Sequence, residues 1–268
     1  SKVDSVFARK GTAQPGDVMK YSFPRSDLDV TAGGVKLKPA FALGSWVAFK
    51  REGASVMAMG DLVLSENEVD SVMARLQTGG VKQTALHNHL LGESPRVMYM
   101  HIEAHGSELK IASAIRHALE STGTPLGVPA AAQPAPLELD STAIAAALGY
   151  RGKVNGGVYQ VSVPRADKIL ETGMEIPPSM GVATAINFQP TGGGKAAITG
   201  DFVMTANEVN NVIRALQSSG IQPTAIHSHM LGESPRLFFM HFWANDNATR
   251  LARGLRSALA QMHVIHTI

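Results

Sequence analysis

Residues 60–101 read GDLVLSENEVDSVMARLQTGGVKQTALHNHLLGESPRVMYMH, and residues 200–241 read GDFVMTANEVNNVIRALQSSGIQPTAIHSHMLGESPRLFFMH. At a constant offset of 140 residues, 22 of these 42 positions are identical. Self-similarity at a fixed distance along a chain is the signature of a repeated structural unit. The sequence therefore predicts a tandem duplication.

The duplication extends outward from these stretches. Pro24-Arg25 in the first copy parallels Pro164-Arg165 in the second. Between the copies, TPLGVPAAAQPAPLEL is rich in Pro and Ala, a composition typical of a semi-rigid linker. We expect a first repeat over residues 1–123, a linker over 124–139 and a second repeat over 140–268. Two copies of one unit are expected to pack on each other about a pseudo-two-fold axis.

Each copy carries the same secondary-structure signals. In the first, the apolar runs 46–49 and 56–64 predict a hairpin, and Ser65 with Glu68 forms a capping box before a helical pattern. Residues 84–91 and 97–105 predict two strands joined by a turn at 92–96, and a last helical pattern follows. The predicted fold is α+β, a duplicated ββαββα unit with mostly antiparallel sheets and helices on one face.

Composition excludes several classes of protein. Of the 268 residues, 44% are hydrophobic and 17% charged, which is typical of a folded chain. No apolar run is long enough for a transmembrane helix. A net charge of +2 and an aromatic content of 6% argue against a nucleic-acid partner. The chain has no cysteine, so any metal must be held by His, Asp, Glu or backbone oxygen.

Histidines recur at matched places in the two copies. Side chains alternate along a strand, so His87 and His89 point the same way. With a turn at 92–96, His87 is expected opposite His101. Three imidazoles and a carboxylate suit a divalent metal, with Zn²⁺ favoured and Cu, Fe, Mn or Ni as alternatives. The predicted metal ligands are His87, His89, His101, His105, His227, His229, Glu233 and His241.

The first functional hypothesis is a metal-dependent hydrolase. A bound metal would activate a water molecule. Glu93 or Glu103 would act as general base, and Arg96 would stabilise developing negative charge. The substrate, a small molecule or a polymer, is not indicated by the sequence.

Three alternatives stay open. A non-enzymatic protein could bind or buffer the metal at the same histidines. The spacing His-x-His-x-x-x-Glu also occurs in cupins, which leaves oxidative metal chemistry open. A duplicated structural module could use the histidines only as a polar network between its halves.

A family resemblance adds a location. The motifs GDLVLSENEV at Gly60, TALHNHLL at Thr84 and the Pro-Arg pairs resemble the LppY/LpqO family of bacterial proteins in both copies. That family is of unknown function and largely exported. The resemblance therefore implies a secreted or periplasmic location, with which the lack of cysteine agrees.

Overall fold

A computed structural model describes residues 1–128 and 135–266 of the chain. Each repeat contains one six-stranded sheet in which every strand pairing is antiparallel. In spatial order, the first sheet consists of β1 (Thr12–Gln14), β2 (Val18–Pro24), β5 (Gly44–Glu52), β6 (Ser55–Ser65), β8 (Val97–Gly106) and β7 (Lys82–His87). The second consists of β15 (Gln222–His227), β16 (Phe238–Asn247), β14 (Lys195–Met204), β13 (Ala183–Gly192), β10 (Val158–Pro164) and β9 (Lys153–Asn155).

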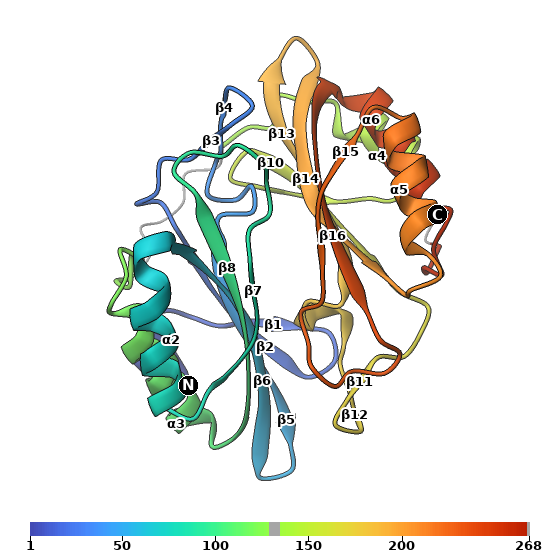
Figure 1. Ribbon diagram of the computed structural model, residues 1–268. Coiled ribbons are helices and arrows are strands. Elements are labelled where there is room, and N and C mark those ends of the chain that lie inside the picture. The colour runs from blue at the N-terminus through green and yellow to red at the C-terminus, as the bar shows by residue number, and fades with distance from the viewer. Residues whose placement is uncertain (129–134, 267–268) are drawn as a thin grey trace.

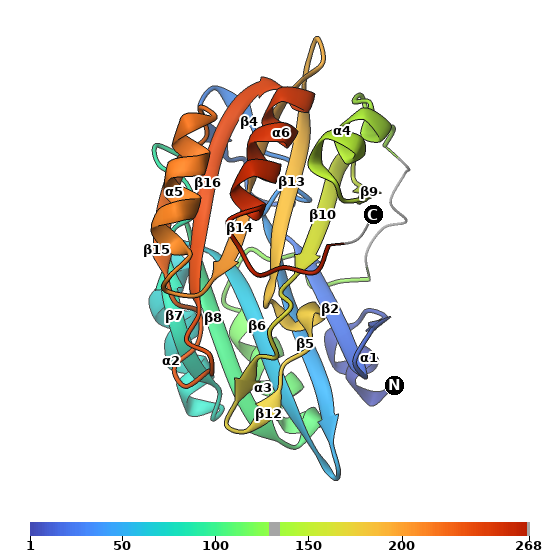
Figure 2. The same cartoon turned by 90° about the vertical axis from the view of Figure 1, so that its right-hand side faces the viewer.

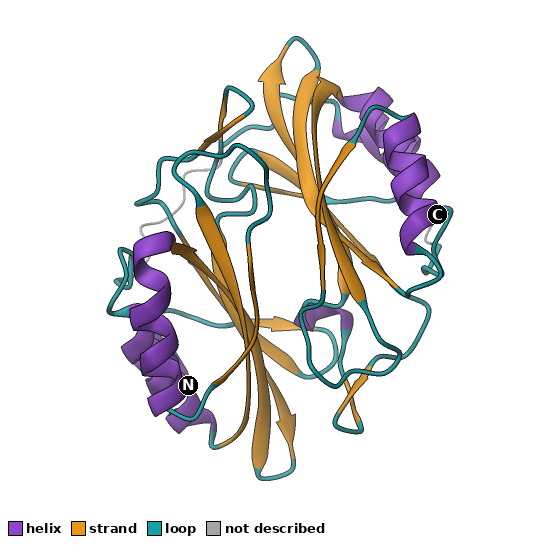
Figure 3. Ribbon diagram, viewed as in Figure 1, coloured by secondary structure: helices purple, strands orange, loops and turns teal. Residues whose placement is uncertain are grey.

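Helices cover the outer face of each sheet, and each repeat adds a small two-stranded hairpin (Figures 1 and 3). The helices of the first repeat are α1 (Lys2–Phe7), α2 (Val69–Thr78) and α3 (Glu108–Leu119), and its hairpin is β3 (Thr31–Ala32) with β4 (Val35–Lys36). Those of the second are α4 (Ser141–Leu148), α5 (Val209–Ser218) and α6 (Ala248–Leu259), with the hairpin β11 (Leu170–Glu171) and β12 (Met174–Glu175). The predicted duplicated α+β fold is confirmed.

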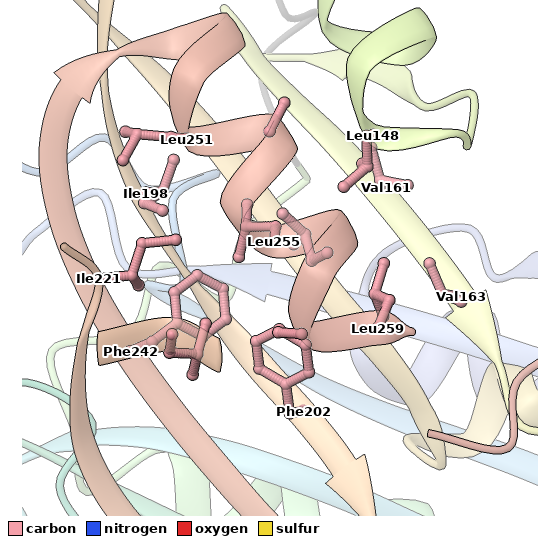
Figure 4. Packing of buried hydrophobic residues seen from close by; sticks show 14 of the residues in the cluster. Leu148, Val161, Val163, Ile198, Phe202, Ile221, Phe242, Leu251, Leu255 and Leu259 are labelled. Atoms are coloured by element: carbon pink, nitrogen blue, oxygen red, sulfur yellow. The ribbon is translucent and has the colours of Figure 1, made fainter. Parts of the chain in front are cut away.

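The helices pack on their sheets through apolar side chains at helical spacing. In the second repeat, Leu251, Leu255 and Leu259 of α6 point toward the sheet and contact a core that includes Phe202 and Phe242 (Figure 4). The first repeat has the corresponding core beneath α2 and α3. This packing uses one face of each sheet and leaves the other face free to meet the second repeat.

The two repeats pack on each other through their inner sheet faces. One mixed core cluster joins Met57 and Met59 of the first repeat to Met230 and Phe239 of the second. Another joins first-repeat residues such as Phe41 to second-repeat residues such as Ala197. The resulting order is helices, sheet, sheet, helices, which Figure 1 shows from one side and Figure 2 after a quarter turn.

Glutamate side chains cap the backbone before the helical segment in each repeat. The predicted capping box forms at Ser65 and Glu68, where the backbone N–H of Ser65 donates to Glu68 at 2.8 Å. At the equivalent place in the second repeat, the backbone N–H of Thr205 donates to Glu208 at 2.7 Å. Of the predicted linker at 124–139, residues 129–134 lie outside the described residues, as do 267–268 at the end of the predicted second repeat.

The predicted strand register at the histidines is wrong. His87 pairs with Tyr99, and Ala85 pairs with His101, after an irregularity between Gln83 and Ala85. The strand ends at His87 rather than continuing to residue 91, so His89 lies in the following loop. The connection between the strands is therefore longer than the predicted turn, and this shifts the pairing by two residues.

Candidate metal centre

Six histidines meet where the inner faces of the two sheets come together. His87 and His227 end the edge strands β7 and β15. His101 and His241 lie within the neighbouring strands β8 and β16. His89 and His229 follow two residues after the ends of β7 and β15. Each repeat thus contributes the same three positions to one interface.

The imidazole rings stack across the interface in three pairs. His87 lies on His227, His89 on His241 and His101 on His229, each with ring centroids 3.6 Å apart. His89 corresponds to His229 in the other repeat, and His241 corresponds to His101. The second and third pairs are therefore equivalent contacts related by the pseudo-two-fold axis. The six rings therefore form one centre shared by the repeats.

Four of these histidines bring ligand atoms together. One ring nitrogen from each of His87, His227, His229 and His241 lies within 4.8 Å of the other three. The Nε2 atom of His227 is 2.8 Å from Nε2 of His229 and 3.2 Å from Nε2 of His241. Neutral imidazole has one donor and one acceptor nitrogen, so this geometry suits either a hydrogen-bonded chain or a shared cation.

Burial keeps these rings uncharged. Loss of hydration lowers the pKa of His87 to about 4 and that of His227 to about 3. The pKa values of His89, His101, His229 and His241 also lie well below the usual value, first because of burial and then because neighbouring imidazoles repel added charge. At neutral pH the nitrogens carry free lone pairs, which is the state that binds metal.

Two aspartates face the histidines from the neighbouring strands. Asp61 pairs with His101 between β6 and β8, and Asp201 pairs with His241 between β14 and β16. Their carboxylate oxygens stay 3.7 Å and 3.8 Å from these rings, which is too long for a hydrogen bond. Burial raises the pKa of Asp61 to about 7, and burial with the charge of Asp61 raises that of Asp201 well above its usual range.

Several buried polar atoms at the centre lack a hydrogen-bond partner among the described residues. They are Nε2 of His87, His89 and His101 and one carboxylate oxygen each of Asp61 and Asp201. A buried polar atom without a partner costs about 1–3 kcal/mol. Water molecules or a bound cation between these atoms would remove that cost.

Backbone and aromatic contacts orient the rings. Nδ1 of His241 donates to the carbonyl oxygen of Gly200 at 2.8 Å, which leaves its Nε2 free as a ligand. His89 stacks on Tyr99, whose hydroxyl donates to the carbonyl of Ala42 at 2.8 Å. His229 stacks on Phe239 in the same way, at 3.7 Å between ring centroids.

Neither of the catalytic residues predicted in the turn, Glu93 and Arg96, is a member of the four-histidine group. Oε1 of Glu93 accepts from the backbone N–H of Val97 at 3.2 Å, and burial raises the pKa of Glu93 to about 7. Arg96 forms an ion pair with Glu66 at 3.6 Å, and the two side chains are 64% and 62% exposed. Arg96 therefore lies at the surface and not beside the histidines.

The remaining predicted residues belong to a different cluster. Glu103 is buried and lies 3.2 Å from Nε2 of His105. Glu233 accepts from the backbone N–H of Leu237 at 2.9 Å and from Arg236 at 3.1 Å. None of Glu103, His105 and Glu233 is a member of the four-histidine group.

Asp61 and Asp201 face the histidines, although neither is among the site residues predicted from the sequence. A signal was present. Gly-Asp opens both copies of the repeat, and each Asp lies on a predicted strand that precedes the His-bearing hairpin. Strand alternation then places the carboxylates on the histidine face.

The family model described as Domain of Unknown Function (DUF1259) matches residues 1–121 and 142–261, one match for each repeat. The chain belongs to this family. The LppY/LpqO assignment expected from the motifs is corrected by this match. A comparison with curated proteins found no match.

Two solved structures of shell proteins show a weak likeness. A trimeric bacterial microcompartment shell protein, PduB, is 14% identical over 96% of both chains, with a TM-score of 0.25. The double-ringed trimeric shell protein MSM0271 from the RMM microcompartment is 10% identical over 78% of this chain and 84% of its own, with a TM-score of 0.20. Scores at this level carry no conclusion about function.

Two further expectations are corrected. The secreted or periplasmic location depended on the LppY/LpqO resemblance, and it loses its basis because the family match corrects that resemblance. The zinc hydrolase assignment is likewise corrected, since the matching family is one of unknown function and supplies no hydrolase activity. The structure does contain a histidine cluster that could hold a metal ion.

In the described part of the chain, no helix combines the length and apolar character needed to cross a bilayer.

Proposed function

We propose that this protein binds a divalent transition-metal ion between its two repeats and that the ion joins them. The observation that carries the proposal is the group formed by His87 of the first repeat and His227, His229 and His241 of the second, with ligand atoms within 4.8 Å of one another. Neither repeat supplies this group alone.

The donor set selects a class of metal. Imidazole suits Zn²⁺, Cu²⁺, Ni²⁺ and Fe²⁺. Four nitrogens at about 2.0–2.1 Å around a tetrahedral ion would lie about 3.3 Å from one another. The distances of 2.8 Å and 3.2 Å from His227 to His229 and His241 are close to this value.

The arrangement favours a holding role over catalysis. Four protein ligands close a tetrahedral site, whereas catalytic sites keep a position open for water. Arg96, the residue expected to stabilise charge in a reaction, is paired with Glu66 at the surface. A metal that bridges the repeats would supply the partner that the buried Nε2 of His87 lacks.

Metal content tests the proposal. The full chain without a polyhistidine tag is loaded with Zn²⁺, Cu²⁺ or Ni²⁺, desalted and measured by mass spectrometry, alongside His227→Ala. The control is His117→Ala, since the side chain of His117 on α3 is 65% exposed and outside the centre. We expect near-stoichiometric metal in the wild type and the control, and loss in His227→Ala. Equal metal in all three proteins would contradict the proposal.

A further inference from the structure

A second cluster of ionisable side chains lies at the interface, beside but separate from the histidine centre. It contains Glu103 and His105 from β8 of the first repeat, and Glu171 from β11 and Glu233 of the second. Glu103, Glu171 and Glu233 are 3%, 3% and 6% exposed. Three buried carboxylates in one place need compensating charge.

The backbone brings these groups together. Leu170 pairs with Ser234 through an isolated bridge, and this places Glu171 next to the 232–233 turn. A Cβ atom on Gly232 would lie only 3.1 Å from Oε1 of Glu171, so that carboxylate sits directly against the turn. Glu103 and Glu233 lie close enough that, after burial, their charges raise the pKa of Glu171.

The cationic partners do not balance the carboxylates. Glu233 has Arg236 at 3.1 Å, and Glu103 has His105 at 3.2 Å. Glu171 forms no ion pair in the described part of the chain. Its Oε2 atom is buried there without a hydrogen-bond partner. A buried carboxylate that keeps one oxygen unpartnered near two other buried carboxylates is the arrangement that a cation would complete.

The pseudo-two-fold axis shows that this cluster is specific to one side of the molecule. At the equivalent place, Trp243 and Asn245 replace Glu103 and His105. The bridge between Thr31 and Ser94 corresponds to that between Leu170 and Ser234, so Ala32 replaces Glu171. There the indole of Trp243 fills the space, 3.1 Å from where a Cβ on Gly33 would lie. That side therefore keeps one carboxylate, Glu93, beside the indole of Trp243, whereas this side gathers three carboxylates.

We propose that Glu103, His105, Glu171 and Glu233 form a second cation site, for a divalent ion that prefers oxygen ligands. Mn²⁺ matches three carboxylates and one imidazole best, whereas the all-imidazole centre suits later transition metals. Among the described residues, only the histidines already bring ligand atoms together, so the second site requires bound water to complete its coordination. The His105 side chain, 32% exposed, gives the ion a route from solvent.

Mn²⁺ binding to the full chain tests this site, measured by the loss of the free-ion electron paramagnetic resonance signal. Glu171→Gln keeps the shape of the side chain and removes its charge. Glu175→Gln is the matched control, because Glu175 is in the same hairpin with a side chain 54% exposed. His227→Ala reports whether Mn²⁺ uses the histidine centre. We expect Glu171→Gln to weaken Mn²⁺ binding at least about tenfold, as loss of a metal-site partner does, with the other two variants unchanged.

Three results would overturn the second site. The wild type could bind no Mn²⁺ at millimolar concentration. Mn²⁺ could be lost in His227→Ala and kept in Glu171→Gln, which would assign the ion to the histidine centre. Glu171→Gln could be more heat-stable while binding Mn²⁺ like the wild type, which would identify Glu171 as a protonated carboxyl. Because the histidine centre is tested by its own variant, either site can fail without the other.

Discussion

His87 lies on His227 with ring centroids 3.6 Å apart and ring planes inclined by 27°. The two residues are 140 positions apart and equivalent in the repeats, so each ring stacks on its own counterpart. The pseudo-two-fold axis therefore passes near this pair. A ligand held here contacts both repeats at once, and its binding is coupled to their association.

Metal should stabilise the folded chain. An ion that binds only the folded state at one hundred times its Kd adds about 2.7 kcal/mol to the free energy of unfolding. We expect the melting temperature to rise on adding Zn²⁺ or Ni²⁺ and to fall again with a chelator, as measured by calorimetry. His227→Ala should show no such rise. A wild-type melting temperature that changes with neither metal nor chelator would argue against an ion that joins the repeats.

Acid should destabilise the metal-free protein between about pH 6.5 and 4. In the unfolded chain histidine protonates near 6.5, whereas in the folded chain the pKa is about 4 for His87 and about 3 for His227. In this window the unfolded state holds more protons, so stability is intact above pH 6.5 and is lost as the pH falls.

The buried carboxyls oppose this effect. The pKa of Asp61 is raised to about 7, so its contribution to stability is complete below its unfolded value near 3.8 and is lost as the pH rises through 7. Six histidines outnumber the two aspartates at the centre, and we expect a net loss in urea unfolding between pH 7 and 5. His87→Gln should flatten this slope. A slope of the opposite sign would mean that the carboxyls dominate.

Arg25 should be a major contributor to the stability of the first repeat. Its side chain is fully buried and bonds both oxygens of Glu68, at 2.8 and 3.0 Å, as well as Asp27. Removing one partner of a buried ion pair costs about 3–5 kcal/mol. We expect that loss for Arg25→Ala in denaturant unfolding, whereas the exposed Arg51→Ala should change stability by less than about 0.5 kcal/mol. A similar small change in both variants would contradict the assignment.

Gly200 should tolerate no side chain. A Cβ atom there would lie 1.9 Å from the carbonyl oxygen of Ala185, and the carbonyl of Gly200 accepts the hydrogen bond from His241. Gly200→Ala must shift the backbone at a cost of about 1–3 kcal/mol, and should also weaken metal binding. Gly127→Ala is the control, since nothing lies within 4 Å of its Cβ position. Equal metal affinity in both variants would show that this carbonyl does not orient His241.

The sequence allowed the repeats and their elements to be predicted because those signals are local. The capping box at Ser65 and Glu68 and the helical spacing behind it depend only on nearby residues. Strand alternation also placed His87 and His101 correctly on one face. The register failed because it depends on the length of the loop after His87, which periodicity does not encode.

The shared nature of the centre could not be predicted from either copy. Repetition indicated two equivalent histidine sets, and strand alternation placed each set on one face. Packing between side chains far apart in sequence, such as Met59 and Met230, decides which surface the histidine face contacts. The same reason hid the role proposed for Glu171, since the charge of Glu103 in the first repeat acts on Glu171 in the second only once the repeats dock.

The central claim is that one ion is held jointly by both repeats, and the metal content of two single variants tests it most directly. His87→Ala removes the first-repeat ligand, and His227→Ala removes its counterpart in the second. The account predicts that either change alone abolishes stoichiometric metal binding to the full chain. If each variant instead kept half of the metal of the wild type, the repeats would hold separate ions and the shared centre would be wrong.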